Sequence, residues 1–209
     1  MKAKVLAEWF IRQLPELTEG CHDNNVRVNK LLYFLNLYYF SIFDEVIVDE
    51  NFVAFPEGPV IQAIYRDYRY NGLDNYPSND IKIEDSKLLN LLKFICFVYG
   101  NKTARELTEE THKHNLWLEV KDQIPTNPVI NFNNASKQLI EDCKTMYKDY
   151  SLVDFDKIKK EIVNGNIYYY NTDNIKYLDD DTITKLLNIR VKNTEPQFIE
   201  KINGEIVFS

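Results

Sequence analysis

Apolar residues recur with helical spacing through the first 150 residues. A stripe between Lys2 and Gln13 predicts a helix that ends near Pro15. The longest apolar stretch, Val26 to Phe40, is hydrophobic almost all round, which is typical of a helix packed on several sides. Asn24 or Asn25 is a suitable N-cap for it. We therefore expect this helix to form the centre of the core.

The middle of the chain mixes extended and helical signals. Glu45 to Phe55 holds two β-branched and aromatic runs around Asp49-Glu-Asn51, which predicts a short hairpin or arm. Pro59 fits the first turn of a following helix, and Asn71-Gly72 suits its end.

Three further helices follow in the pattern. Ser86 is expected to cap a helix that ends at Gly100. Thr103-Ala-Arg-Glu106 has the spacing of a capping box, in which the hydroxyl and the carboxylate satisfy free backbone donors at a helix start. Asn133 to Tyr147 has one more amphipathic pattern.

Beyond Tyr150 short segments replace the long helices. We expect, in order, a helix over Asp154–Val163, strands over Ile167–Tyr170 and Ile175–Leu178, a short helix capped by Asp181 and ending at Leu187, and strands over Gln197–Ile202 and Glu205–Phe208. Asn203-Gly204 between the last two strands is a strong hairpin signal, because both positions tolerate positive φ.

The pattern as a whole predicts a mainly α protein of the α+β class. Residues 1–150 are expected to form a compact helical domain with a short β-hairpin. Residues 151–209 are expected to form a small α/β subdomain that ends in a hairpin, with a soft boundary between the two.

Composition narrows the class of function. The 25 Lys and Arg residues are outnumbered by 32 Asp and Glu, giving a net charge of −7, and acidic residues exceed basic ones on both sides of Tyr150. Nucleic-acid binding is therefore not expected, because it relies on basic side chains that neutralise phosphates. Three widely spaced cysteines indicate reduced thiols, and the least charged apolar stretch, Leu31–Phe43, is shorter than the roughly 20 residues of a membrane span. We expect a cytoplasmic protein without a membrane association.

Motifs of catalysis are missing from the sequence. His22, His112 and His114 are its three histidines, and none stands in an H-E-x-x-H pattern. The six glycines form no phosphate-binding loop, and no G-x-S-x-G nucleophile elbow occurs. We expect no catalytic residue, no metal site and no cofactor, and favour binding over chemistry.

Three segments in order resemble a known family: Val28-Asn-Lys-Leu-Leu-Tyr-Phe-Leu35, Val53-Ala-Phe-Pro-Glu-Gly-Pro-Val60, and Tyr99-Gly followed by Thr103-Ala-Arg-Glu-Leu-Thr-Glu-Glu-Thr-His112 and Trp117. Together they are similar to the Panacea domain, the SocA-like antitoxin family that includes phage-associated proteins. The resemblance covers residues 1 to about 120. Phe55 replaces the usual Trp, and Pro56-Glu57 stands where the family has a basic and an aromatic residue.

The resemblance implies an antitoxin that neutralises a cognate toxin by direct protein–protein binding, and for which a ClpXP-type protease is a further partner. The acidic charge suits a basic toxin. Two alternatives remain: a metal- or His-dependent enzyme that uses His112 with a nearby carboxylate, and a phage or mobile-element regulatory protein.

The motif residues are the expected partner-binding or fold-defining positions: Lys30, Tyr33, Gly58, Pro59, Val60, Tyr65, Thr111, His112 and Trp117. Gly58 permits backbone conformations barred to other residues, and Pro59 is expected to start a helix. Lys30 and Tyr33 share one helix face. His112 is expected to hydrogen-bond in the core with Trp117 packed over it. We expect these residues to hold the fold rather than to contact the partner.

Overall fold

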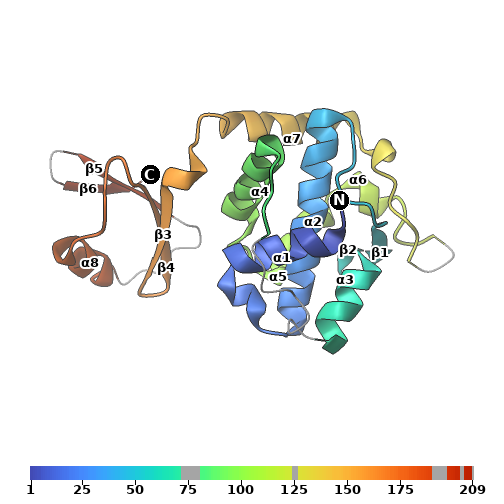
Figure 1. Cartoon of the computed structure of the whole chain (residues 1–209), viewed down its shortest axis with the longest axis horizontal. Helices are drawn as coiled ribbons and strands as arrows, with labels where there is room; N and C mark the ends of the chain where they lie inside the picture. The colour runs from blue at the N-terminus through green and yellow to red at the C-terminus, as the bar shows by residue number, and fades with distance from the viewer. Residues whose placement is uncertain (72–80, 124–126, 190–196, 203–204, 209) are drawn as a thin grey trace. The chain divides into compact units, whose positions relative to one another are not determined.

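A computed structural model describes residues 1–71, 81–123, 127–189, 197–202 and 205–208 (Figure 1). The chain divides into two compact units, Met1–Leu152 (unit 1) and Val153–Ser209 (unit 2). Unit 1 is helical with one small hairpin, and unit 2 is built on a four-stranded sheet. The expected mainly α fold of the α+β class is confirmed. No helix in the described residues is long and apolar enough to cross a membrane.

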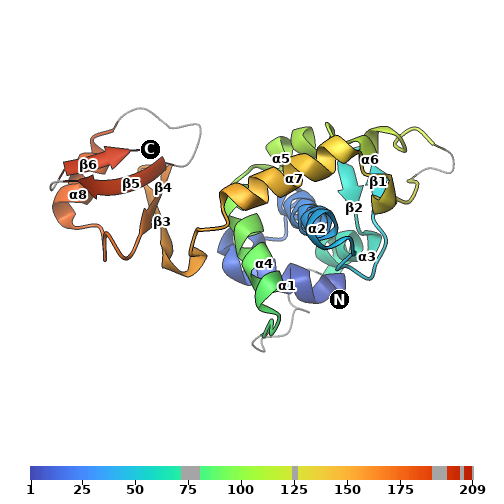
Figure 2. The ribbon, with the colours of Figure 1, turned by 90° about the horizontal axis from the view of Figure 1, so that it is seen from above.

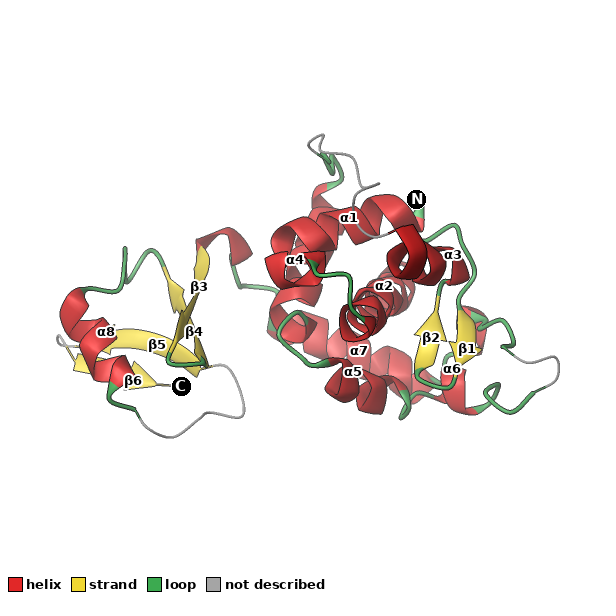
Figure 3. Ribbon diagram, turned by 90° about the horizontal axis from the view of Figure 1, so that it is seen from below, coloured by secondary structure: helices red, strands yellow, loops and turns green. Residues whose placement is uncertain are grey.

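Helix α2 (His22–Phe43) is the centre of unit 1. Figures 2 and 3 show it nearly end-on, surrounded by other helices. These neighbours are α1 (Ala3–Gln13), α3 (Gln62–Arg66), α4 (Ser86–Tyr99), α5 (Ala104–Thr111) and α7 (Lys137–Asp149). The interior face of α2 is apolar and aromatic, and Leu32, Phe34 and Leu35 are fully buried. Burial on several sides explains why its hydrophobic pattern has no polar face.

Helix α2 is longer than its pattern predicted. It begins at His22 with Cys21 as N-cap, and ends at Asp44, which adopts a left-handed conformation with φ of 59°. The expected caps, Asn24 and Asn25, lie inside the helix, because both side chains donate to backbone carbonyls of neighbouring segments.

The β-hairpin lies further along the chain than expected. Strand β1 (Val53–Phe55) pairs antiparallel with β2 (Gly58–Val60), and Glu45–Val48 forms no strand. Pro59 therefore lies in a strand, and α3 begins only at Gln62. A π-helical turn, Asp67–Asn71, continues α3; the expected helix end at Gly72 falls outside the described residues.

The remaining helices of unit 1 follow the sequence signals closely. The capping box at Thr103 and Glu106 is present and opens α5. Asp85 rather than Ser86 caps α4, because its carboxylate accepts from two backbone amides of the first turn. A short helix α6 (Asn115–Leu118) follows α5. The last amphipathic segment starts later than expected, at Lys137, with Ser136 as its cap.

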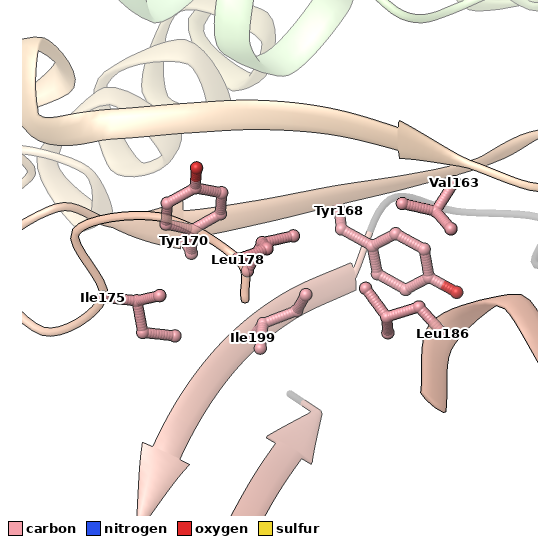
Figure 4. Packing of buried hydrophobic residues seen from close by; sticks show 7 residues of the cluster. All are labelled: Val163, Tyr168, Tyr170, Ile175, Leu178, Leu186 and Ile199. Carbon is pink, nitrogen blue, oxygen red and sulfur yellow. The ribbon is translucent and has the colours of Figure 1, made fainter. Parts of the chain in front are cut away.

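The sheet of unit 2 has the order β3-β4-β5-β6. Its strands are β3 (Ile158–Val163), β4 (Asn166–Asn171), β5 (Gln197–Ile202) and β6 (Glu205–Phe208), and its helix is α8 (Asp180–Leu187). The outer pairs are antiparallel and the central pair β4–β5 is parallel. Tyr168, Ile199 and Leu186 meet in its core, which Figure 4 shows from close by. The expected strands β5 and β6 are confirmed.

Three expectations for unit 2 are wrong. Asp154–Val163 is not helical: a 3-10 turn, Phe155–Lys157, leads into β3. Asn164-Gly165 forms the β3–β4 turn with φ values of 52° and 77°, so this pair closes a hairpin rather than a helix. Ile175–Leu178 forms no strand and places two apolar side chains in the core. Asp179 rather than Asp181 caps α8.

Candidate functional site: a buried lysine beneath the β1–β2 hairpin

The turn of the β1–β2 hairpin is held by three helices. The Glu57 carboxylate lies 3.1 Å from Nε2 of His22 in α2, and the Thr108 hydroxyl of α5 donates to the Glu57 carbonyl oxygen. The indole N–H of Trp117 in α6 donates to the carbonyl oxygen of Phe55, at 2.9 Å. Glu57 itself is exposed. The turn is therefore fixed in place while its tip faces solvent.

Lys30 lies directly beneath this hairpin and is fully buried. Its ammonium nitrogen donates to the carbonyl oxygen of Pro59 at 3.2 Å. Desolvation lowers the pKa of Lys30 to about 7, and the charge of Glu57 opposes this shift. Burying a charged group away from water costs free energy, so burial disfavours the protonated form of this lysine.

Gly58 is the residue that lets the hairpin approach Lys30. Its φ of +99° is strained for any residue with a side chain. A Cβ at this position would lie 2.7 Å from Oγ1 of Thr111 and 2.9 Å from Nζ of Lys30. The Thr111 hydroxyl donates to the Thr108 carbonyl within α5. Hairpin, α2 and α5 thus meet at one point that has no room for a methyl group.

His112 and Trp117 close the other side of this cluster. Their rings are stacked, with centroids 3.7 Å apart and planes 9° from parallel. Desolvation lowers the pKa of His112, and the charge of Lys30 lowers it further. Its Nε2 atom is buried and has no hydrogen-bond partner among the described residues. His112 is therefore held by its stack on Trp117 and by a hydrogen bond with the Pro56 backbone, and Lys30 is the charged group that acts on it most strongly.

The buried face of α2 carries amides that hold neighbouring loops. Asn25 donates to the carbonyl oxygen of Tyr65, and Oδ1 of Asn29 accepts from the amide of Ile61. About two helical turns after Asn29, Oδ1 of Asn36 accepts hydrogen bonds from the backbone N–H groups of Ile47 and Val48. Asn29 and Asn36 are missing from the sequence-based predictions, which named Asn25 only as a candidate N-cap. Their signal was the repeated use of Asn, a poor helix former, inside an apolar helix.

His114 is a second group that the sequence reading did not single out for the core. Its Nδ1 atom lies 3.1 Å from the hydroxyl of Tyr33, which is fully buried. Burial lowers the pKa of His114 to about 4 and raises that of Tyr33 well above its usual range. Both groups are therefore neutral near pH 7 and fix α6 to α2 by a hydrogen bond between uncharged partners.

The predicted site residues divide by position. The cluster beneath the hairpin collects Lys30, Gly58, Pro59, Thr111, His112 and Trp117. The others lie at its margins: Tyr33 contacts His114, Val60 pairs with Val53 across the hairpin, and the Tyr65 ring packs on Phe55. His112 and Tyr65 are half-buried, and the rest are buried.

Metal-binding chemistry has no visible basis in the described part of the chain. No group of three or more His, Cys, Asp or Glu side chains there is arranged to hold an ion. The arrangement beneath the hairpin instead does structural work: it joins five elements through one lysine, one glycine and one aromatic stack. The fold and this site define a helical domain whose motif residues lie mostly in its interior.

Residues 28–118 match the family model described as antitoxin SocA-like, Panacea domain. The resemblance inferred from the three motifs is thereby confirmed over these residues of unit 1. The match runs from within α2 to the end of α6 and includes every residue of the cluster beneath the hairpin. Comparison with curated proteins and with solved structures gave no match.

Proposed function

We propose that this protein is an antitoxin that neutralises a cognate toxin by forming a direct complex with it in the cytoplasm. The observation that carries the proposal is the match of residues 28–118 to the SocA-like Panacea domain. The cluster beneath the hairpin adds a physical reason for that match, because the motif residues account for the position of the hairpin and of three helices around it.

In this proposal the motif residues position the binding surface rather than form it. Lys30, Gly58 and Thr111 are buried, so a partner cannot reach them without unfolding the hairpin. The exposed Pro56-Glu57 tip stands directly above them, and it is the place where this chain departs from the family pattern. We assign fold maintenance to the cluster and partner discrimination to the exposed residues around it.

The toxin that fits best is a basic protein. The chain carries a net charge of −7, and complementary charge speeds encounter between partners and disfavours wrong ones. The resemblance also implies that the bound toxin is delivered to a ClpXP-type protease. This second role predicts that the half-life of the toxin shortens when the antitoxin is present and that deletion of the protease reverses the effect.

The decisive experiment expresses the product of the adjacent gene with and without the full-length chain. We expect growth arrest by the neighbour alone, rescue by co-expression, and a stoichiometric complex on size-exclusion chromatography. A neighbour that is harmless alone, or that stays toxic beside well-expressed antitoxin, contradicts the proposal.

The Glu57→Lys variant tests the hairpin tip. This residue is exposed, so weaker rescue at unchanged thermal stability would locate the partner there.

A further inference from the structure

A second feature of unit 1 is a cavity of about 310 Å³ between α2, α7 and the α5–α6 segment. This volume is at the lower end of the range for ligand pockets, about 300 to 1,000 Å³. It has room for one long side chain and is small for a nucleotide or a drug-sized molecule. The cavity lies away from the hairpin, and none of the exposed residues around the Pro56-Glu57 tip lines it.

The floor of the cavity is aromatic and uncharged. The hydroxyls of Tyr38 and Tyr99 are 2.8 Å apart, and the Tyr38 hydroxyl also lies 2.9 Å from Sδ of Met146. Burial raises the pKa of the Cys143 thiol to about 12, so this group is neutral as well. The apolar atoms of these side chains and the polarizable thioether of Met146 together suit the aliphatic stem of a long side chain.

The rim of the cavity is acidic. Glu110 is paired with Lys113 at 3.0 Å, so these two charges largely cancel. Asp142 accepts a hydrogen bond from the Gln138 amide at 2.7 Å, and no cation pairs with its carboxylate in the described ranges. His114, on the same wall, is neutral because burial lowers its pKa to about 4. The one uncompensated charge at the pocket is therefore negative.

We propose that this pocket binds an arginine side chain of a protein partner, with the aliphatic stem against Tyr38 and Met146 and the guanidinium facing Asp142. The inference rests on the proposed function in that it requires a protein partner. A guanidinium is planar, stacks on aromatic rings and donates two parallel hydrogen bonds to a carboxylate. The lysine ammonium lacks the planar fork of donors, and a tyrosine or tryptophan side chain has a single donor and no positive charge. Arginine is also one of the residues that dominate binding energy at interfaces.

The chain offers an unusually clean probe for this site. It has two methionines, Met146 at the pocket and Met1 in a different part of unit 1, and they are 39% and 40% exposed. Labelling the methyl carbons of methionine gives one reporter and one internal reference in the same NMR spectrum. The probe is the blocked tripeptide acetyl-Gly-Arg-Gly-amide, with the Lys and norleucine tripeptides as comparisons.

We expect the Arg tripeptide to shift the Met146 signal in a saturable way and to leave the Met1 signal unchanged. The Met146 shift should be larger than the shift that either comparison peptide causes. Asp142→Asn should weaken binding about tenfold, because a charge-assisted hydrogen bond is lost. Glu141→Gln is the matched control: it removes the charge of the neighbouring exposed residue in α7, and Glu141 does not line the pocket. This variant should bind as the unaltered chain does.

Three results would overturn the assignment: no saturable Met146 shift, equal shifts with the Lys or norleucine peptide, or equal weakening by both variants.

In the co-expression assay, Asp142→Lys should rescue growth less well than Glu141→Lys. Full rescue by Asp142→Lys would refute the pocket while leaving the antitoxin proposal intact. Failure of every variant and of the unaltered chain to rescue would refute the proposed function, whereas the peptide titration would still decide the pocket.

Discussion

Replacing the buried lysine by methionine is predicted to stabilise the protein at neutral pH. Lys30→Met keeps an unbranched side chain of similar length and removes the group whose charge the interior cannot solvate. The pKa of Lys30 falls from its ordinary value of 10.5 to about 7. This shift means that burying the ammonium destabilises the folded state by about 5 kcal/mol. Against this, the Pro59 carbonyl loses its donor, which costs about 1–3 kcal/mol.

The sign of the pH dependence follows from the direction of the shift. Because the pKa of Lys30 is lower in the folded state, the unfolded chain binds more protons between about pH 7 and pH 10.5, and stability rises with pH across that window. Below about pH 7 both states are protonated, so the cost is constant there. The Lys30→Met variant lacks this rise. It should be more stable than the unaltered chain by about 3 kcal/mol near pH 6.5, and less stable by about 1 kcal/mol near pH 10, where the unfolded lysine still keeps most of its proton.

Urea denaturation followed by tryptophan fluorescence measures the effect, since Trp9 and Trp117 are both buried. Subtracting the variant profile from that of the unaltered chain cancels the titrating groups that do not interact with Lys30; His112 and Glu57 do interact with it. Lys144→Met, on the exposed face of α7, is the control and should show the pH slope of the unaltered chain. Parallel profiles for the unaltered chain and Lys30→Met would refute the reasoning, because they would mean that Lys30 keeps its proton, or its solvation, in both states.

Two further predictions concern the backbone conformation at Gly58 and the capping box at the start of α5. Gly58→Ala should lower the free energy of unfolding by about 3 kcal/mol, since it adds a clash to a strained φ; Gly165→Ala, which also has positive φ but open space around its Cβ, should cost about 1 kcal/mol. Equal losses in urea denaturation would show that the close approach to Lys30 is unimportant. Thr103→Ala removes the capping box of α5 and should lower stability by about 1 kcal/mol, and an unchanged urea midpoint would count against this estimate.

The helical core was predictable because its signals are local. The aromatic pattern of α2 and the capping box of α5 depend on residues within one helix, and both were read correctly. The hairpin was placed wrongly because Pro59 has the same φ preference in a helix start and in an extended strand. Its true position is decided by Lys30 and Thr111, which are distant in sequence and meet only in the folded chain.

The segment before Asn164-Gly165 shows the same limit. Asn-Gly ends helices and also turns hairpins, since both uses need positive φ. The charged run ahead of it fits a helix and an edge strand equally well, and pairing with the tyrosines of β4 decides for the strand. The paired residues lie at most 13 positions apart, from Ile158 to Asn171, so the Asn-Gly turn was a local signal that was assigned to a helix end instead.

For the candidate site, family resemblance located what periodicity did not. Lys30 and His112 were identified through their motifs, whereas Asn36 and His114 belong to no motif that was considered, and Asn29 was not singled out within the first motif. An asparagine in an apolar helix was read as a cap, because that is its commonest local use. Its partners are backbone groups of loops, and those become visible only when the fold is known.

The buried polar side chains of α2 have a consequence for how such a scaffold diversifies. Its asparagines and Lys30 hold main-chain N–H and carbonyl groups, not side chains, of the segments that wrap around the helix. A carbonyl is present whatever amino acid occupies a position, and an N–H is present in all but proline. The wrapping segments can therefore exchange their outward side chains while their anchors persist. The same buried contacts can thus support many different sets of surface residues, so selection for a new partner need not begin with a new fold.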